Sequence, residues 1–266
     1  MVETNMTPGT KRIAVVTGAN KGIGYGICQQ LASNGVKAVL TARDVKRGNE
    51  AVDKLKTAGY SDVVFRQLDV TDPVSISPLL DFIKTQFGKL DILKRVNPNS
   101  PMRMRIAMLG TSYSHKELIP LLQLSNSARI VNVSSGLGQL KFISNENARK
   151  KLGDVDGLTE EKVDEVVEGF LEDVKKNSIE VKGWPINFSA YVVSKAALNA
   201  YTRVLAQKNP NIAINSVGPG YTKTDLNDNT GVFTIVEAAK GPAMLALIPE
   251  GGPSGLFFDQ TEVSTF

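Results

Sequence analysis

The sequence predicts an α/β fold whose core is a doubly wound parallel sheet. Short runs of β-branched and other apolar residues alternate with segments of helical periodicity, which is the pattern of parallel strands joined by crossover helices. Glycine follows several of the helical segments, at Gly35, Gly59 and Gly88, and a helix commonly ends at such a residue. These two observations together exclude an all-helical or all-β chain.

The predicted elements follow in order along the chain. Strands are expected at residues 13–16, 38–41, 63–68 and 90–93, with a helix after the first ending near Gly35 and further helices at residues 46–57 and 74–87. Residues 94–108 break this rhythm, because 97–101 are typical of a turn or loop and 102–105 show no clear period. Beyond the break we expect a helix from about residue 114 to 122, strands at 129–135 and 212–217, and a helix at 190–205.

A highly charged stretch at residues 144–186 separates Ser135 from Tyr191 by far more chain than a connection between a strand and a helix needs. An apolar stripe within it, at Val163, Val166, Val167, Phe170 and Val174, predicts a helix over residues 159–176. A disordered charged loop is the alternative. We expect residues 1–266 to form one domain with a helical insertion at 144–186.

Composition limits the classes of function. The chain has 266 residues, 42% of them hydrophobic and 22% charged, and no apolar run is long enough to span a membrane. The net charge of +4 is spread out, so we expect no nucleic-acid partner. His115 is the only histidine and has no evident partner ligands, so we expect no metal site. The single cysteine, Cys28, fits a reducing compartment, and the polar start of the chain does not resemble a signal peptide. We therefore expect a cytoplasmic protein.

Glycines at 18, 22 and 24 lie between the first predicted strand and the first predicted helix. Without side chains they let a pyrophosphate approach the backbone N–H groups at a helix N-terminus, as in a Rossmann fold. The residues predicted to form this phosphate loop are Gly18, Asn20, Lys21, Gly22, Ile23 and Gly24. The cations Lys21 and Arg43 favour the 2′-phosphate of NADP(H), although Asp44 follows Arg43 and two ordinary surface cations remain the alternative.

Tyr191 and Lys195 are four residues apart, so they lie on one face of a predicted helix. A ketone that accepts hydride needs a proton donor near its oxygen, and a cation beside a tyrosine lowers the pKa of the phenol toward neutrality. Ser135, at the end of the fifth predicted strand, would donate a hydrogen bond to the same oxygen. The alternative is a core tyrosine, an exposed lysine and a helix-capping serine.

Two further loops are candidates for cofactor contacts. Pro219, Gly220, Thr222 and Thr224 follow the sixth predicted strand and are expected to hold the nicotinamide carboxamide. Asp69, with Val70, follows the third and is expected to meet the adenine amino group. A turn and a helix cap explain these residues equally well.

Taken together, these motifs resemble the short-chain dehydrogenase/reductase family. The resemblance rests on residues 17–24, on 132–135, on Tyr191 and Lys195, and on Pro219-Gly220, and it covers nearly the whole chain. Within the family, the chain resembles plant reductases that act on terpenoids and alkaloids. The resemblance implies that Tyr191 is the acid/base, that Lys195 tunes it and binds the nicotinamide ribose, and that Ser135 orients the carbonyl. It also implies a small ketone as substrate and, through the insertion, a monomer.

The chain departs from the family pattern in one segment. After residue 93 the family continues with Val-Asn-Asn-Ala-Gly, whereas this chain continues with Lys94-Arg95-Val96-Asn97-Pro98, and the position of the family's catalytic asparagine falls at Ala107. Three hypotheses follow. The first is an NADPH-dependent carbonyl reductase, and the second is a reductase of a conjugated carbon–carbon double bond. The third is a non-catalytic or defective NADP-binding variant, because segment 94–112 departs from the family pattern, in which Val-Asn-Asn-Ala-Gly lines the cofactor.

Overall fold

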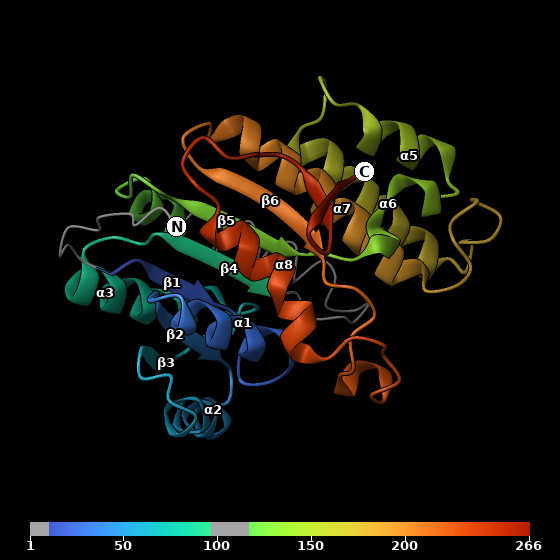
Figure 1. The fold of residues 1–266 in the computed structure, drawn as a ribbon. Coiled ribbons are helices and arrows are strands. Elements are labelled where there is room, and N and C mark those ends of the chain that lie inside the picture. The colour runs from blue at the N-terminus through green and yellow to red at the C-terminus, as the bar shows by residue number, and fades with distance from the viewer. Residues whose placement is uncertain (1–10, 97–116) are drawn as a thin grey trace.

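A single eight-stranded sheet forms the centre of the computed structural model, which describes residues 11–96 and 117–266 (Figure 1). Its strand order is β3-β2-β1-β4-β5-β6-β7-β8, and every neighbouring pair is parallel except β7 and β8. The strands are β1 (Ile13–Val16), β2 (Lys37–Ala42), β3 (Val63–Gln67), β4 (Ile92–Val96), β5 (Arg129–Val133), β6 (Ala213–Gly218), β7 (Phe257–Asp259) and β8 (Glu262–Ser264). The predicted doubly wound parallel sheet is therefore confirmed.

Helices cover both faces of this sheet (Figure 1). One face packs against α1 (Gly22–Ser33), α2 (Val45–Thr57) and α8 (Ile235–Leu247). The other packs against α3 (Ile76–Phe87), the helical residues 117–122, α5 (Glu146–Gly153), α6 (Glu160–Lys175) and α7 (Ser189–Lys208). Short 3₁₀ turns, η1 (Pro73–Ser75), η2 (Gly136–Gly138), η3 (Leu140–Phe142) and η4 (Asp225–Asn227), complete the described elements.

The strand order places the ligand crevice. From β1 the chain winds outward through β2 to β3 and then crosses back to β4 on the other side of β1. Ligands of open parallel sheets bind outside the carboxyl ends of the strands at such a switch point. The loops that follow β1, β2, β3, β5 and β6 all lie at this end of the strands. Together with the start of α1 and with α7, they carry the predicted site residues.

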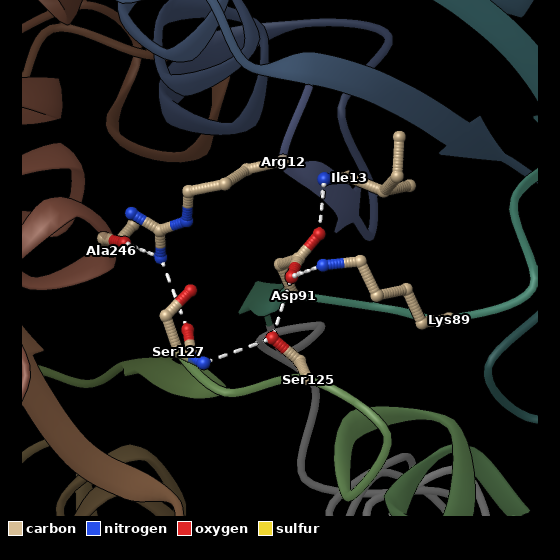
Figure 2. A network of polar contacts seen from close by, with 7 residues as sticks. All are labelled: Arg12, Ile13, Lys89, Asp91, Ser125, Ser127 and Ala246. Atoms are coloured by element: carbon tan, nitrogen blue, oxygen red, sulfur yellow. Dashed lines mark hydrogen bonds and ion pairs between the residues drawn. The ribbon is translucent and has the colours of Figure 1, made fainter. Parts of the chain in front are cut away.

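At the opposite end of the strands, a polar network links the residues where β1, β4 and β5 begin (Figure 2). The carboxylate of Asp91, fully buried, accepts hydrogen bonds from the Ile13 backbone at 2.8 Å and from the Ser125 hydroxyl, and it pairs with Lys89 at 2.9 Å. Arg12 extends the network, because its guanidinium donates to the carbonyl oxygens of Ser127 and Ala246. Burial of the Asp91 charge is thus matched by specific partners.

Strand β4 runs further than its sequence predicts. The expected strand ends at Leu93, but the described strand continues through Lys94 to Val96. The reason is that β1 and β5 both pair with it, with Lys94 between Val16 and Val131. Backbone pairing on two sides outweighs the low β-propensity of a charged residue. The remainder of the unusual segment, 97–112 with Ala107, lies outside the described residues.

The charged stretch before α7 holds two described helices. Helix α6 begins after Thr159, whose side chain accepts a hydrogen bond from the backbone of Lys162 and caps the helix. The predicted apolar stripe is buried against the same core as α7 at Val163, Val166, Val167 and Phe170, whereas Val174 is exposed. Phe170 meets Trp184 edge to face with ring centroids 5.1 Å apart. Figure 1 shows α6 beside α7, the helix that carries Tyr191 and Lys195.

Candidate active site

The phosphate loop connects β1 to α1 through two glycines in the left-handed region, Gly18 and Gly22, each with φ of +59°. Gly24 is required by close approach instead: a Cβ there would lie 2.8 Å from the carbonyl oxygen of Gly18. Asn20 and Ile23 are half-buried in the loop and the first turn of α1. These glycines bring the loop backbone against the helix N-terminus, as a pyrophosphate cradle requires.

The N-terminus of α1 has the character of an anion site. Its N-cap residue is Lys21, whose side chain makes no capping hydrogen bond, and no acidic residue lies in the first turn. Unpaired N–H groups and the positive end of the helix dipole therefore face the crevice. The ammonium of Lys21 lies 2.5 Å from a carboxylate oxygen of Asp225, so an ion pair bridges the phosphate loop and η4.

The end of β2 offers a cation, Arg43, for which no ion pair is found among residues 11–96 and 117–266. Arg43 is exposed directly after the strand. Asp44, the alternative partner for a ribose hydroxyl, instead caps α2 by accepting a hydrogen bond from the Arg47 backbone at 2.9 Å. Asp69 is similarly engaged, because one carboxylate oxygen accepts from the backbone and the hydroxyl of Thr71. Val70 is half-buried against the core.

Residues 219–224 approach the phosphate loop from β6. Pro219 opens this segment, and Gly220 follows with φ of +79° beside the ring of Phe233. Thr222 is buried, and its hydroxyl donates to the Gly220 carbonyl at 3.1 Å. The methyl group of Thr224 lies close to Gly22, 3.8 Å from where a Cβ of that glycine would stand. The predicted carboxamide loop and phosphate loop are therefore neighbours.

Ser135, Tyr191 and Lys195 come together at the carboxyl end of β5. Ser135 caps η2, and its side chain is hydrogen-bonded to Tyr191. Lys195 is buried, donates to the carbonyl oxygen of Val133 at 3.2 Å, and holds its ammonium 5.5 Å from the centroid of the Tyr191 ring. A hydroxyl, a phenol and an amine thus share one corner of the crevice.

The electrostatics of this corner differ from the expectation in one respect. Burial raises the pKa of Tyr191 above 10.0, and the hydrogen bond from Ser135 partly opposes that rise. The lowering expected from Lys195 is wrong for the protein alone, because burial raises the pKa of Tyr191 and only the hydrogen bond from Ser135 lowers it. Burial also lowers the pKa of Lys195 to about 8, so most of the amine still carries a proton at neutral pH.

Sequence reasoning missed two buried polar residues beside the site. Lys94 is fully buried in β4, and its amine has no hydrogen-bond partner in the described parts of the chain. Asn199 lies one helical turn after Lys195 and donates to the Gly138 carbonyl at 3.2 Å. A signal existed for Asn199, because it continues the four-residue spacing of Tyr191 and Lys195; Lys94 stood out only as a departure from the family pattern.

No group of three or more His, Cys, Asp or Glu residues in ranges 11–96 and 117–266 is placed to hold a metal ion. No helix among those described is long and apolar enough to cross a membrane.

Comparison with known proteins identifies the family. The chain is 47% identical to salutaridine reductase of Papaver somniferum, with 96% of each protein covered, and 46% identical to its solved structure, with a TM-score of 0.88 over 94% of this chain and 99% of that one. It is 47% identical to (+)-neomenthol dehydrogenase of Capsicum annuum, covering 96% of this chain and 98% of the relative. Carbonyl reductase [NADPH] 1 of Rattus norvegicus is 36% identical, with 94% and 97% covered.

The family model described as short chain dehydrogenase matches residues 12–147 and 177–232. The gap between the two matched ranges contains α6, so this helix is an addition to the common fold. With a match over more than half of the chain and relatives at 47% identity, the protein belongs to the short-chain dehydrogenase/reductase family of nicotinamide-dependent oxidoreductases.

Proposed function

We propose that the protein is an NADPH-dependent reductase that transfers a hydride to the carbonyl carbon of a small terpenoid- or alkaloid-like ketone. The observation that carries the proposal is the contact of Ser135 with Tyr191, beside Lys195, at the edge where the phosphate loop opens. The relatives named salutaridine reductase, (+)-neomenthol dehydrogenase and carbonyl reductase [NADPH] 1 support the substrate class.

The residues present fit NADPH. The uncapped start of α1 and the close approach of Gly24 to Gly18 suit a pyrophosphate, which would lie against residues 18–24. Arg43 and Lys21 would hold the 2′-phosphate, and Lys195 the nicotinamide ribose. Asp44 uses one carboxylate oxygen to cap α2, whereas the side chain of Arg43 makes no such contact among the described residues, which favours the 2′-phosphate of NADPH over the ribose hydroxyl of NAD. When bound, the reduced nicotinamide supplies the hydride.

The chain's own residues supply the proton and the stabilisation of charge. Tyr191 donates its phenolic proton to the carbonyl oxygen, and its raised pKa keeps that proton in place at neutral pH. Ser135 donates a hydrogen bond to the same oxygen as negative charge develops there. The ammonium of Lys195 stabilises the tyrosinate that remains.

Turnover is tested by incubating the purified protein with NADPH and a panel of monocyclic terpenoid ketones while absorbance at the reduced nicotinamide band is followed. We expect oxidation of NADPH with at least one ketone, and a higher melting temperature with NADPH than without it. No oxidation with any ketone at any pH would overturn the proposal. A higher melting temperature without turnover would indicate a non-catalytic NADP-binding variant.

Arg43→Glu tests the choice of cofactor. We expect affinity for NADPH to fall about 10- to 100-fold while affinity for NADH changes little, because the substitution removes a charge-assisted contact and adds repulsion to the 2′-phosphate. Titration of both cofactors by quenching of protein fluorescence measures the two dissociation constants. Equal losses for both cofactors would show that Arg43 does not contact the 2′-phosphate.

We also propose that the protein is a cytoplasmic monomer. Helix α6 packs its apolar stripe on α7, with an ion pair of 2.7 Å between Glu160 and Lys208, so an addition to the common fold occupies that side of α7. Light scattering at micromolar concentration should give a mass near 28.7 kDa. A stable dimer or tetramer would contradict the proposal.

A further inference from the structure

Asn199 occupies the third of three successive turns on one face of α7, after Tyr191 and Lys195. The side chain is 3% exposed, and its amide nitrogen donates to the carbonyl oxygen of Gly138 at 3.2 Å. Gly138 is the last residue of η2, the 3₁₀ turn that Ser135 caps. A single hydrogen bond therefore joins the helix of Tyr191 to the turn of Ser135.

The turn and the helix also touch through their backbones. A Cβ on Gly138 would lie 2.8 Å from the backbone carbonyl carbon of Lys195, closer than real Cβ atoms approach. Within the turn, the Gly138 backbone donates to the Ser135 carbonyl at 2.9 Å. A shift of Gly138 therefore moves Ser135, because the two residues are joined by one tight turn.

Stability does not explain why an asparagine stands here. Its amide oxygen is buried and has no hydrogen-bond partner in the part of the chain that the structure describes. A neutral hydrogen bond contributes less to folding than an unsatisfied buried acceptor costs. An apolar residue of similar size would avoid that cost, so the half-satisfied Asn199 serves something other than the free energy of folding.

We propose that Asn199 is a positioning residue that holds the Ser135 turn against α7, so that the serine hydroxyl reaches both Tyr191 and the substrate oxygen. The inference rests on the proposed reductase activity for its catalytic consequence. Its structural part, the contact between Ser135 and Tyr191, is independent of that activity. Asn199 acts through Ser135 and does not touch the reacting atoms itself.

The test compares Asn199→Leu with two other variants. In Gly138→Ala the added methyl group would press η2 away from the backbone of α7, so this variant displaces the same turn without changing Asn199. It provides the test if Asn199→Leu does not fold. Thr202→Val is the matched control, because Thr202 is buried on the same helix and accepts a hydrogen bond from Asn132 at 2.9 Å, away from η2.

We expect Asn199→Leu and Gly138→Ala to lower kcat about 10²-fold, the effect of misplacing a catalytic group by about 1 Å. Asn199→Leu should leave the dissociation constant of NADPH nearly unchanged. The melting temperature of Asn199→Leu should equal or exceed that of the wild type. Thr202→Val should lower the melting temperature and leave kcat within about twofold.

A second readout does not depend on turnover. The hydrogen bond from Ser135 lowers the pKa of Tyr191, so its loss in Asn199→Leu should shift the ionisation of that phenol to higher pH. Ultraviolet difference titration against Tyr191→Phe isolates this signal from the other tyrosines. If the wild type has no turnover, the proposed function fails while the titration still decides the role of Asn199. An Asn199→Leu protein with the ionisation of the wild type, or a Thr202→Val protein that shifts it equally, would overturn the inference.

Discussion

Replacing Tyr191 by Phe should lower kcat for ketone reduction about 10³-fold, within the range that one general acid contributes. The phenylalanine keeps the packing of a side chain that is mostly buried but removes the proton that the carbonyl oxygen must receive. Binding of NADPH, measured by the rise in melting temperature, should persist because the phosphate loop is untouched. Steady-state kinetics with a saturating ketone measure the loss.

Tyr201→Phe is the matched control for this change, since Tyr201 is a buried tyrosine on the same helix and the site does not use it. Its kcat should stay within about twofold of the wild type. In the wild type, reduction should decline only at alkaline pH, because burial raises the pKa of Tyr191 and the acid form must be present. A Tyr191→Phe enzyme with wild-type kcat would show that Tyr191 is not the proton donor.

The second large effect is on stability. Lys94→Met should raise the free energy of unfolding by about 2 kcal/mol, the scale of the cost of an unsatisfied buried polar group, and the melting temperature by roughly 4–8 °C. The amine of Lys94 is fully buried with no hydrogen-bond partner among the described residues, in contrast to Asp91, which has several. Methionine fills a similar volume without the polar atom.

The pH dependence of the free energy of unfolding tests whether the buried amine of Lys94 is what destabilises the fold. Burial lowers the pKa of Lys94 well below 10.5, and the repulsion of Lys195 adds to the shift. Cys28 does not compensate at neutral pH, because burial raises the pKa of its thiol to about 12. At pH values between the folded and the ordinary pKa of Lys94, its amine is protonated in the unfolded chain but neutral in the folded chain. The free energy of unfolding therefore rises with pH up to about the ordinary lysine pKa and falls as pH drops below that pKa.

Urea denaturation at several pH values measures how the free energy of unfolding changes with pH, and Lys94→Met should reduce this slope. Part of the slope should remain between about pH 8 and 10.5, because the pKa of Lys195 is also lowered in the fold. Lys84→Met, on the exposed face of α3, is the control and should change neither the stability nor the slope. A less stable Lys94→Met protein would mean that the buried amine has a stabilising partner.

The parts of the fold that follow local rules could be predicted from sequence. The alternation of strands and helices, the glycine loop after β1 and the pairing of Tyr191 with Lys195 depend on short patterns within one element or one connection. The end of β4 could not be predicted, because Lys94 and Arg95 are poor strand residues that the neighbouring strands hold in place. Strands β7 and β8 are three residues each and exist through pairing with β6 and with each other.

Some features of the candidate site could likewise be predicted from sequence, and others could not. The sequence placed the residues at the carboxyl ends of strands, where the sheet brings Ser135 to Tyr191 although the two are far apart in the chain. It did not predict that burial raises the pKa of Tyr191, because desolvation depends on the whole packed environment. The role of Asn199 depends on the contact of two distant backbones at Gly138 and Lys195, which no local pattern encodes.

Transfer of deuterium from NADPH that carries deuterium at both C4 positions of the reduced nicotinamide tests the proposed reaction most directly. The protein is incubated with a panel of saturated and conjugated terpenoid ketones, and mass spectrometry locates the label in the product. We expect deuterium on the carbinol carbon of an alcohol, since Ser135 and Tyr191 address the carbonyl oxygen. Deuterium on a former alkene carbon, with the carbonyl intact, would instead show double-bond reduction. No label in any product would contradict catalysis by this chain.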